Sequence, residues 1–196
     1  VAAKIQSAGV VDIAVSAAFA PVNPDMENRA ATILAELLPD ASITKSHEVG
    51  QLGLLERENA AILNAALRPL ARRTVEAFRK AIAGLGIAAP LYLTQNDGTL
   101  MTADFAERFP VLTFASGPSN SVRGAAFLSG RRNALVLDVG GTTSDIGVLV
   151  DGFPRRSSLA VDVGGVRTNF RMPDVYSFGL GGGSIVTEEG DSVRVG

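Results

Sequence analysis

Short apolar runs and helical periodicity alternate over the first part of the chain. Residues 10–19 form an apolar run that predicts a buried strand. Residues 23–38 predict a helix, because an Asn-Pro-Asp start precedes apolar side chains that fall on one face. Residues 41–46 predict a second strand. This strand–helix–strand order is typical of the α/β class.

The strongest helical pattern lies between residues 56 and 84, where large apolar side chains recur at helical spacing. Pro69 lies in the middle of this stretch, and proline both removes a helix hydrogen bond and clashes with the preceding turn. We therefore expect either two helices or one bent helix. Gly84 and Gly86 supply the stop signal.

The C-terminal half predicts short strands separated by turns that contain glycine. A helix is expected after the Ser-Gly-Pro-Ser sequence that starts at Ser116, and Asp151-Gly152 is a two-residue hairpin signal. The expected strands cover residues 91–94, 111–115, 134–139, 144–150 and 153–163.

Composition and charge narrow the class of protein. Hydrophobic residues make up 46% of the 196 positions and charged residues 19%, which suits a folded α/β core. The net charge of −2 and the scattered arginines give no electrostatic case for a nucleic-acid partner. No apolar run approaches the ~20 residues of a membrane span, and no signal-peptide pattern opens the chain. The lack of cysteine fits a reducing compartment. We expect a cytoplasmic protein that binds neither nucleic acid nor membrane.

The clearest chemistry lies in residues 135–145, with the sequence LVLDVGGTTSD. A buried strand carries Asp138 near its end, and the Gly140-Gly141 pair follows at the turn. Glycine there lets backbone N–H groups approach a phosphate without a Cβ in the way, and Thr142-Thr143 adds hydroxyl donors. Asp138 and Asp145 together could hold a hydrated Mg²⁺, which takes oxygen ligands.

Two interpretations of this hairpin remain open on the residues alone. It binds phosphate, or its glycines only make a tight turn. The chain has neither a P-loop nor a strand-linked GxGxxG motif, so a phosphate site here would be of a different kind. A second glycine-rich segment, residues 181–184, is either a flexible turn before a strand at Ile185 or a further part of a nucleotide site.

Read together, these motifs resemble the N-methylhydantoinase A/5-oxoprolinase family. Residues 138–145 resemble its central Asp-x-Gly-Gly-Thr-Ser-Thr-Asp motif, with Thr143-Ser144 in place of Ser-Thr. Residues 114–126 resemble its Gly-Pro loop and the following helix, and residues 93–101 its Gln-Ser-Asn-Gly-Gly segment. Further matches extend the likeness over nearly the whole chain, at residues 23–24, 46–49 and 63–69.

The resemblance implies a fold, a cofactor and site residues. The fold is α/β, an incomplete actin-like (ribonuclease H-like) ATPase lobe with a mixed sheet and flanking helices. The implied cofactors are ATP and Mg²⁺ or Mn²⁺, with Asp138 and Asp145 acting in catalysis and as metal ligands. The implied nucleotide-binding residues are Gly140, Gly141, Thr142, Thr143, Gly181, Gly182, Gly183 and Ser184, the later glycine turn lying against the adenosine.

Family members couple ATP hydrolysis to the opening of a cyclic amide such as hydantoin or 5-oxoproline. The first expectation is therefore an ATP-dependent cyclic amidohydrolase. A subunit of an ATP-dependent ketone carboxylase of the same family is one alternative, and a non-catalytic actin-like nucleotide-binding module is another. The implied partners are a small cyclic amide and either further copies of the chain or a second subunit.

The resemblance also divides the chain, with residues 1–46 as the tail of a first lobe and residues 47–196 as part of the second. The superfamily closes two lobes around ATP, each with its own phosphate hairpin. The family's N-terminal Asp-x-Gly-Gly-Thr loop and its His-Gly-Thr-Thr segment are absent from the sequence, so we expect a fragment that is inactive alone. His47, the only histidine, is expected to be a hydrogen-bonded structural group rather than a proton shuttle.

Overall fold

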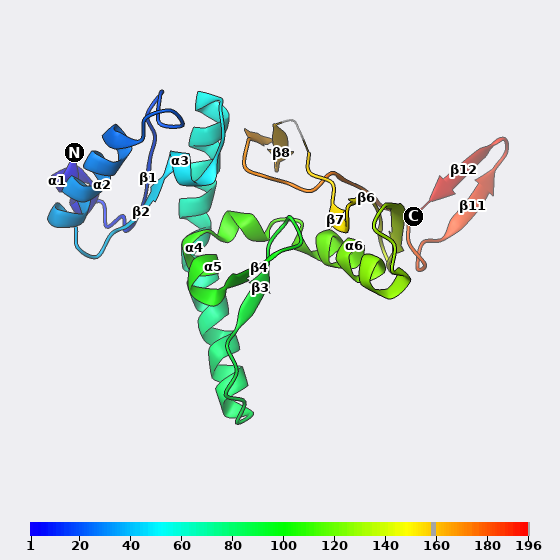
Figure 1. Ribbon diagram of the computed structural model, residues 1–196. Coiled ribbons are helices and arrows are strands. Elements are labelled where there is room, and N and C mark those ends of the chain that lie inside the picture. Colours follow the sequence, from blue (N-terminus) through cyan, green and yellow to red (C-terminus); the bar gives the residue numbers. More distant parts are fainter. Residues whose placement is uncertain (158–159, 196) are drawn as a thin grey trace. The chain divides into compact units, whose positions relative to one another are not determined.

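The computed structural model describes residues 1–157 and 160–195, which form helices and strands of the α/β class (Figure 1). The helices are α1 (Ala2–Ser7), α2 (Asp25–Leu37), α3 (Ser46–Val49), α4 (Leu54–Gly84), α5 (Ala103–Arg108), the 3-10 helix η1 (Pro110–Thr113) and α6 (Ser116–Ser129). The strands are β1 (Asp12–Val15), β2 (Ser42–Lys45), β3 (Tyr92–Thr94), β4 (Leu100–Thr102), β5 (Ala134–Val139), β6 (Ser144–Val150), β7 (Phe153–Pro154), β8 (Val161–Val163), β9 (Val166–Thr168), β10 (Val175–Phe178), β11 (Val186–Glu189) and β12 (Ser192–Val195). None of the described helices is long and apolar enough to cross a membrane.

Contacts within the chain divide it into two compact units. The first unit contains Val1–Gln95, Leu100–Phe114 and Ser157–Met172. The second unit contains Asn96–Thr99, Ala115–Arg156 and Pro173–Gly196. The division expected at residue 46 concerns the lobes of a longer protein and stays a prediction.

The strand–helix–strand order predicted at the N-terminus is confirmed in the first unit. β1 and β2 pair in parallel from Asp12↔Ser42 to Val15↔Lys45, and α2 provides the crossover between them. β1 is shorter than the predicted run of residues 10–19. The backbone beyond it leaves the strand, and the N–H of Ala17 donates instead to the Glu27 carboxylate at 2.8 Å.

Pro69 lies inside a single helix, so of the two expected outcomes, two helices or one bent helix, the division into two does not occur. α4 runs without interruption from Leu54 to Gly84, and its ribbon is continuous from cyan to green in Figure 1. Its N-terminal half buries Arg57, Ala60, Ala61, Asn64 and Ala65. This tertiary packing offsets the helix hydrogen bond that proline removes.

The hydrophobic core of the first unit joins segments that lie far apart in the sequence. Residues 110–113 form the 3-10 helix η1 rather than the strand predicted at residues 111–115, and Val111 is fully buried. Asn64 fixes this turn, because its Oδ1 accepts a hydrogen bond from the Val111 N–H at 3.3 Å. The cluster consists of Val49, Ala60, Phe109, Val111 and Phe170.

An antiparallel sheet with the strand order β10–β6–β5 forms the centre of the second unit, and β7 also pairs with β6. α6 packs closely against one face of this sheet. Gly147 has no side chain there, and a Cβ added to it would lie 2.7 Å from Val122 Cγ2 of α6. The strand predicted at residues 153–163 is wrong as one element, because β7 ends at Pro154 and β8 pairs with β9. Ser158 and Leu159, within that range, lie outside the described residues. Parallel and antiparallel pairs thus occur in separate described sheets rather than in one mixed sheet.

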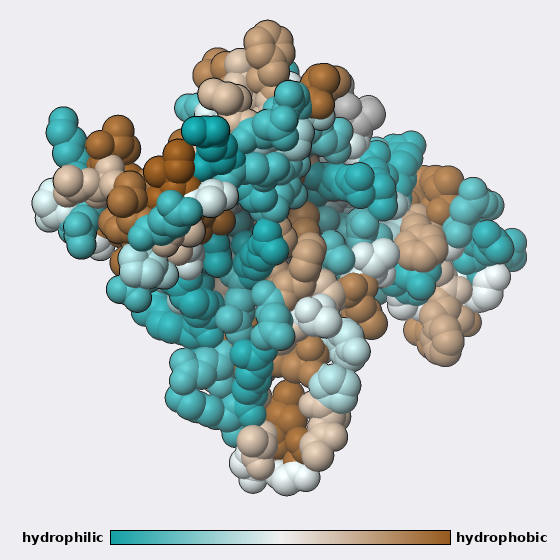
Figure 2. Space-filling view, turned by 60° about the vertical axis from the view of Figure 1, so that its left-hand side comes forward, coloured by the Kyte–Doolittle hydropathy of each residue, from teal (hydrophilic) through white to brown (hydrophobic). Residues whose placement is uncertain are grey.

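The opposite face of this sheet is apolar and open to solvent. Leu135, Leu137 and Val139 of β5 are 71%, 59% and 58% exposed, and Tyr176 of β10 is 69% exposed. The antiparallel register places these four side chains on the same face. The expectation of a buried strand at residues 134–139 is therefore wrong for one face of β5, whose side chains alternate between exposed and partly buried. Brown, apolar atoms reach the surface of the molecule in several places in Figure 2.

Candidate phosphate-binding hairpin

The hairpin of β5 and β6 carries most of the predicted site residues. The two strands pair in register from Ala134↔Leu149 to Val139↔Ser144, which leaves residues 140–143 as the connecting loop. The N–H of Gly140 donates to the Thr143 carbonyl at 2.9 Å and closes the loop. The sequence prediction of two strands joined by a glycine turn is confirmed.

The tip of this loop offers hydrogen-bond donors that the protein does not use. Within the part of the chain that the structure describes, the N–H groups of Gly141, Thr142 and Thr143 donate to no acceptor, and neither threonine hydroxyl makes a hydrogen bond. All three residues are exposed. Successive unpaired N–H groups in a turn form a concave surface that suits an anion such as phosphate.

The second glycine segment lies directly against the first. The N–H of Gly182 donates to the Gly140 carbonyl at 2.9 Å, and the N–H of Gly183 donates to the Gly141 carbonyl at 2.8 Å. A Cβ on Gly181 would lie 2.7 Å from the Gly140 carbonyl oxygen. The two segments, recognised separately in the sequence, therefore form one structure, and two of the later N–H groups are occupied by the hairpin.

Two serines fix the glycine turn from its ends. The Ser144 hydroxyl donates to the Leu180 carbonyl at 2.5 Å, and the Ser184 hydroxyl accepts from the Gly181 N–H at 3.0 Å. Ser184 thus has a structural partner within its own turn. That this turn contacts an adenosine stays a prediction.

Asp138 and Asp145 face one another across the hairpin. They are directly opposed in the register of β5 and β6, so their side chains lie on the same face of the sheet. Among the residues that the structure describes, neither carboxylate has a lysine, arginine or histidine nitrogen within 4.0 Å. Like charges opposed in this way repel, and a cation between them would remove that repulsion.

The donor set fits a magnesium or manganese ion that keeps most of its water. Residues 1–157 and 160–195 contain no group of three or more His, Cys, Asp or Glu side chains that could hold a metal ion. Mg²⁺ in nucleotide sites is commonly held by one or two carboxylates together with phosphate and water oxygens. The Asp138–Asp145 pair meets that requirement without a third protein ligand.

Ser177 is a polar neighbour of this pair that the sequence analysis missed. It is the register partner of Asp145 on β10, and its hydroxyl donates to Asp145 Oδ1. Its sequence signal was a hydroxyl between Tyr176 and Phe178 in an otherwise apolar strand. That signal is weak, because one serine in a short strand has many explanations.

His47 takes part in a buried network in the first unit. Its Nδ1 lies 2.6 Å from Glu27 Oε2, and its backbone N–H donates to the same oxygen at 3.1 Å. The Ser46 hydroxyl and the Ala17 N–H donate to Glu27 Oε1. This geometry supports the structural role expected for His47.

Arg57 completes this network, and no pattern in the sequence around it predicts its burial. Its side chain is 1% exposed, and its Nε donates to the Ser46 hydroxyl at 2.9 Å. Burial by itself raises the pKa of Glu27, but the hydrogen bonds from Ser46 and His47 outweigh it and hold that pKa below its ordinary value. Glu27 is therefore charged at neutral pH, and the Ser46 hydroxyl links its carboxylate to the Arg57 guanidinium inside the first unit.

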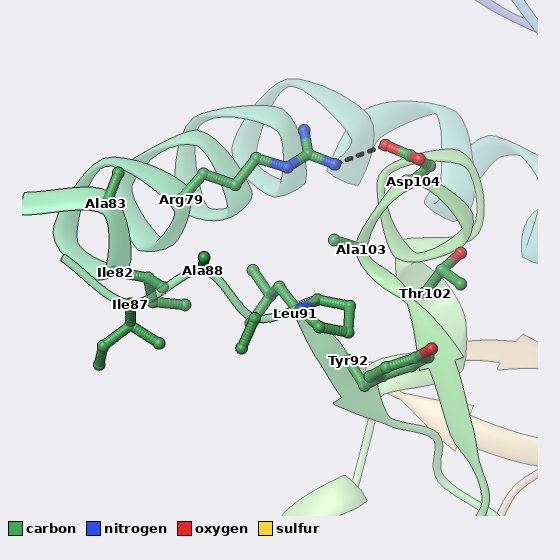
Figure 3. Close-up of a pocket in the computed structure, with 12 residues that line it drawn as sticks. Arg79, Ile82, Ala83, Ile87, Ala88, Leu91, Tyr92, Thr102, Ala103 and Asp104 are labelled. Carbon is green, nitrogen blue, oxygen red and sulfur yellow. Dashed lines mark hydrogen bonds and ion pairs between the residues drawn. The ribbon is translucent and has the colours of Figure 1, made fainter.

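An open hollow of about 470 Å³ also lies in the first unit, beside the C-terminal end of α4 (Figure 3). Ile82, Ile87, Leu91 and Tyr92 give it a mainly apolar lining. Its cation, Arg79, already pairs with Asp104 and Glu107. The hollow presents no convergent group of unused polar side chains, so we place the candidate chemistry at the hairpin.

Comparison with known proteins shows the family of the chain. The family model for hydantoinase/oxoprolinase matches residues 57–196. The chain is 28% identical over 179 residues to the caprolactamase subunit alpha of Pseudomonas jessenii, an alignment that covers 88% of this chain and 25% of that protein. It is also 28% identical over 199 residues to the acetophenone carboxylase gamma subunit of Aromatoleum aromaticum, which covers 96% and 27% respectively.

Two solved structures share the fold. The crystal structure of the ATP-dependent caprolactamase from Pseudomonas jessenii matches with a TM-score of 0.80 and 28% identity, over 94% of this chain and 27% of that one. A nucleotide-free acetone carboxylase matches with a TM-score of 0.68 and 22% identity, over 100% and 28%. The chain belongs to the hydantoinase/oxoprolinase family, and the resemblance drawn from its sequence is confirmed. It spans about a quarter of the length of these relatives.

Proposed function

We propose that the β5–β6 hairpin is one of the phosphate-binding hairpins of an actin-like nucleotide-binding lobe, within an ATP-dependent cyclic amidohydrolase. The observation that carries this proposal is the combination of three unpaired backbone N–H groups at the loop tip with two unneutralised carboxylates beside them. A tight turn alone explains the glycines. It does not explain why two acids oppose each other at its base.

The residues have separate tasks in this proposal. The N–H groups of Gly141, Thr142 and Thr143, with the threonine hydroxyls, bind phosphate oxygens of ATP and hold the reacting phosphorus in place. Asp138 and Asp145 hold a hydrated Mg²⁺ or Mn²⁺, and that ion supplies neutralisation of phosphate charge. Positioning and charge stabilisation are what phosphoryl transfer requires of a protein.

The substrate in this proposal is a cyclic amide, such as 5-oxoproline, a hydantoin or a lactam. Transfer of the γ-phosphoryl group to the amide oxygen releases ADP and activates the ring carbon. Water then attacks that carbon, and the C–N bond breaks with a proton going to the ring nitrogen, which leaves an acyl phosphate. A second water hydrolyses the acyl phosphate to a carboxylate and free phosphate. The name of the caprolactamase relative supports this substrate class, and its description as a subunit supports a second subunit as partner.

A second candidate is a subunit of an ATP-dependent ketone carboxylase. The observation that favours it is the acetophenone carboxylase gamma subunit, which has the same percentage identity as the caprolactamase subunit. The phosphate hairpin would serve both chemistries, because ATP would activate an enol oxygen in the carboxylase. A nucleotide-binding module without chemistry of its own is the third candidate.

The test is phosphate release from Mg-ATP by the longer protein that contains this stretch, together with its partner subunit if one copurifies. The assays contain 5-oxoproline, a set of hydantoins, caprolactam, or a ketone with bicarbonate. Release stimulated by a cyclic amide and abolished in Asp138→Ala supports the amidohydrolase. Bicarbonate-dependent release with a ketone moves the assignment to the carboxylase. Nucleotide binding without stimulated release by any of these leaves the non-catalytic module.

A further inference from the structure

Ser177, Asp145 and Asp138 form a row across three neighbouring strands. The register pairs Ser177 of β10 with Asp145 of β6, and Asp145 with Asp138 of β5. Opposed residues in antiparallel strands share a face, so all three side chains lie on one side of the sheet at its loop end. The central member, Asp145, therefore has a hydroxyl on one side and a second carboxylate on the other.

The hydrogen bond in this row fixes one oxygen of Asp145. Ser177 donates to Oδ1, and a carboxylate with one oxygen held by a neutral donor has a defined orientation for the other. Asp138 and Asp145 repel one another when no cation lies between them. Without the hydroxyl, Asp145 would be free to rotate away from its neighbour and from a shared ligand.

Protein stability does not account for this hydrogen bond. Ser177 is exposed, and an exposed hydroxyl can bond to water instead at little cost. No lysine, arginine or histidine within the described part of the chain pairs with Asp145 to take over the task. The donor is thus placed where its main effect is on the geometry of the carboxylate pair.

We propose that Ser177 is a positioning residue that orients Asp145 for binding a divalent cation together with Asp138. The inference rests on the proposed function, because it needs the carboxylate pair to be the cation site. Ser177 itself does not contact the nucleotide or the metal. Its hydroxyl acts through Asp145, and threonine can keep that donor whereas alanine cannot.

The experiment measures Mn²⁺ binding by electron paramagnetic resonance in the longer protein, with a non-hydrolysable ATP analogue present. Ser177→Ala should weaken Mn²⁺ binding roughly three- to tenfold, the range for loss of one ordinary, solvent-exposed hydrogen bond. Ser177→Thr should restore most of the affinity. Ser192→Ala is the matched control, because Ser192 is an exposed strand serine of the same unit without a hydrogen bond from its hydroxyl in the described chain.

The outcomes separate this inference from the proposed function. Asp138→Ala and Asp145→Ala run beside the serine variants, with thermal melting to check folding. Loss of Mn²⁺ binding in both aspartate variants with unchanged binding in Ser177→Ala overturns the role of Ser177 and leaves the site standing. Equal losses in Ser177→Ala and Ser177→Thr also overturn it, because the hydroxyl is then not what matters. Unchanged Mn²⁺ binding in the aspartate variants overturns the proposed cation site itself.

Discussion

Gly181 lies so close to Gly140 that no side chain can be placed between them. A Cβ on Gly181 would be 2.7 Å from the Gly140 carbonyl oxygen and equally close to backbone atoms of the next two residues. Backbone atoms cannot rotate out of the way as a side chain can. The contact is what holds the glycine turn against the loop that we propose to bind phosphate.

Gly181→Ala should therefore displace the residue 140–143 loop, because the added methyl group overlaps its backbone. We expect a loss of about 1–3 kcal/mol in the free energy of unfolding, because the methyl group forces backbone shifts. ATP affinity should fall with it. Gly179→Ala is the control, since a Cβ there meets nothing within 4 Å. Denaturant unfolding and ATP titration of both variants would check this, and equal behaviour of the two would contradict it.

Gly141→Ala should separate binding from folding. A Cβ at Gly141 meets no protein atom within 4 Å, and the residue does not need a positive φ. We expect the free energy of unfolding to change by less than about 0.5 kcal/mol. ATP affinity should nevertheless fall at least roughly tenfold, because the methyl group blocks the approach of phosphate to the backbone. Full affinity in this variant would place the phosphate elsewhere.

Glu27→Gln should destabilise the first unit. It removes the charge of a buried carboxylate that accepts hydrogen bonds from Ser46, His47 and Ala17, and hydrogen bonds to a charged group contribute about 1.5–3 kcal/mol each. The buried Arg57, which Ser46 links to this carboxylate, also loses a nearby negative charge. Glu36→Gln is the matched control, because Glu36 is an exposed residue of the same helix that makes no ion pair in the described chain. Thermal and urea unfolding at neutral pH would measure the difference. A Glu27 variant as stable as the Glu36 variant would contradict the prediction.

Glu27 should also make the stability of the protein depend on pH. The pKa of Glu27 is lower in the folded protein than in the unfolded one, because the hydrogen bonds that its carboxylate accepts outweigh the effect of burial. As the pH falls, Glu27 is therefore protonated at a lower pH in the folded state than in the unfolded state. The stabilisation is fully present above the ordinary glutamate pKa and is lost as the pH falls below about 4 through the lower folded value. The free energy of unfolding, measured with urea at several pH values in this range, should depend more steeply on pH for the unmodified protein than for Glu27→Gln. Identical slopes would argue against a lowered pKa.

Asn64→Leu should remove the Asn64 partner of three polar groups, of which two are buried and the third, the Arg108 carbonyl, is partly buried. The Asn64 amide donates to Thr44 Oγ1 at 3.1 Å and to the Arg108 carbonyl at 3.0 Å, and accepts from the Val111 N–H. Each buried group left unpaired costs about 1–3 kcal/mol. Asn59→Ala, which removes one hydrogen bond to the Arg167 carbonyl, should cost less. Denaturant unfolding measures the loss in the free energy of unfolding for the two variants. A smaller loss in Asn64→Leu than in Asn59→Ala would contradict the prediction.

The sequence identified the hairpin because glycine pairs and acids are distinctive at a strand end. Gly140, Asp138 and Asp145 were all recognised in this way. The docking of residues 181–183 could not be found, because it depends on β10 pairing with β6 although residues 151–174 lie between these strands in the sequence. Local patterns carry no information on which distant strand becomes a neighbour.

Other differences between sequence and structure have similar physical causes. The apolar run at residues 111–115 suits a strand, but burial of Val111 and its bond to Asn64 select a 3-10 turn. Pro69 is compatible with two helices or with one bent helix, and packing of the helix around it selects a single helix. Glu27 and Arg57 look like surface charges until their neighbours are known, because the sequence does not say which polar residues will meet.

The open apolar face of the β10–β6–β5 sheet affects the solubility of residues 1–196 when they are produced by themselves. β5 pairs on one side only among the described strands, and the side chains of Leu135, Leu137 and Val139 stand uncovered beside that free edge. An uncovered edge of this kind is a template for pairing with another chain. A preparation of these residues alone would tend towards self-association and precipitation, so binding constants are best sought in the longer polypeptide.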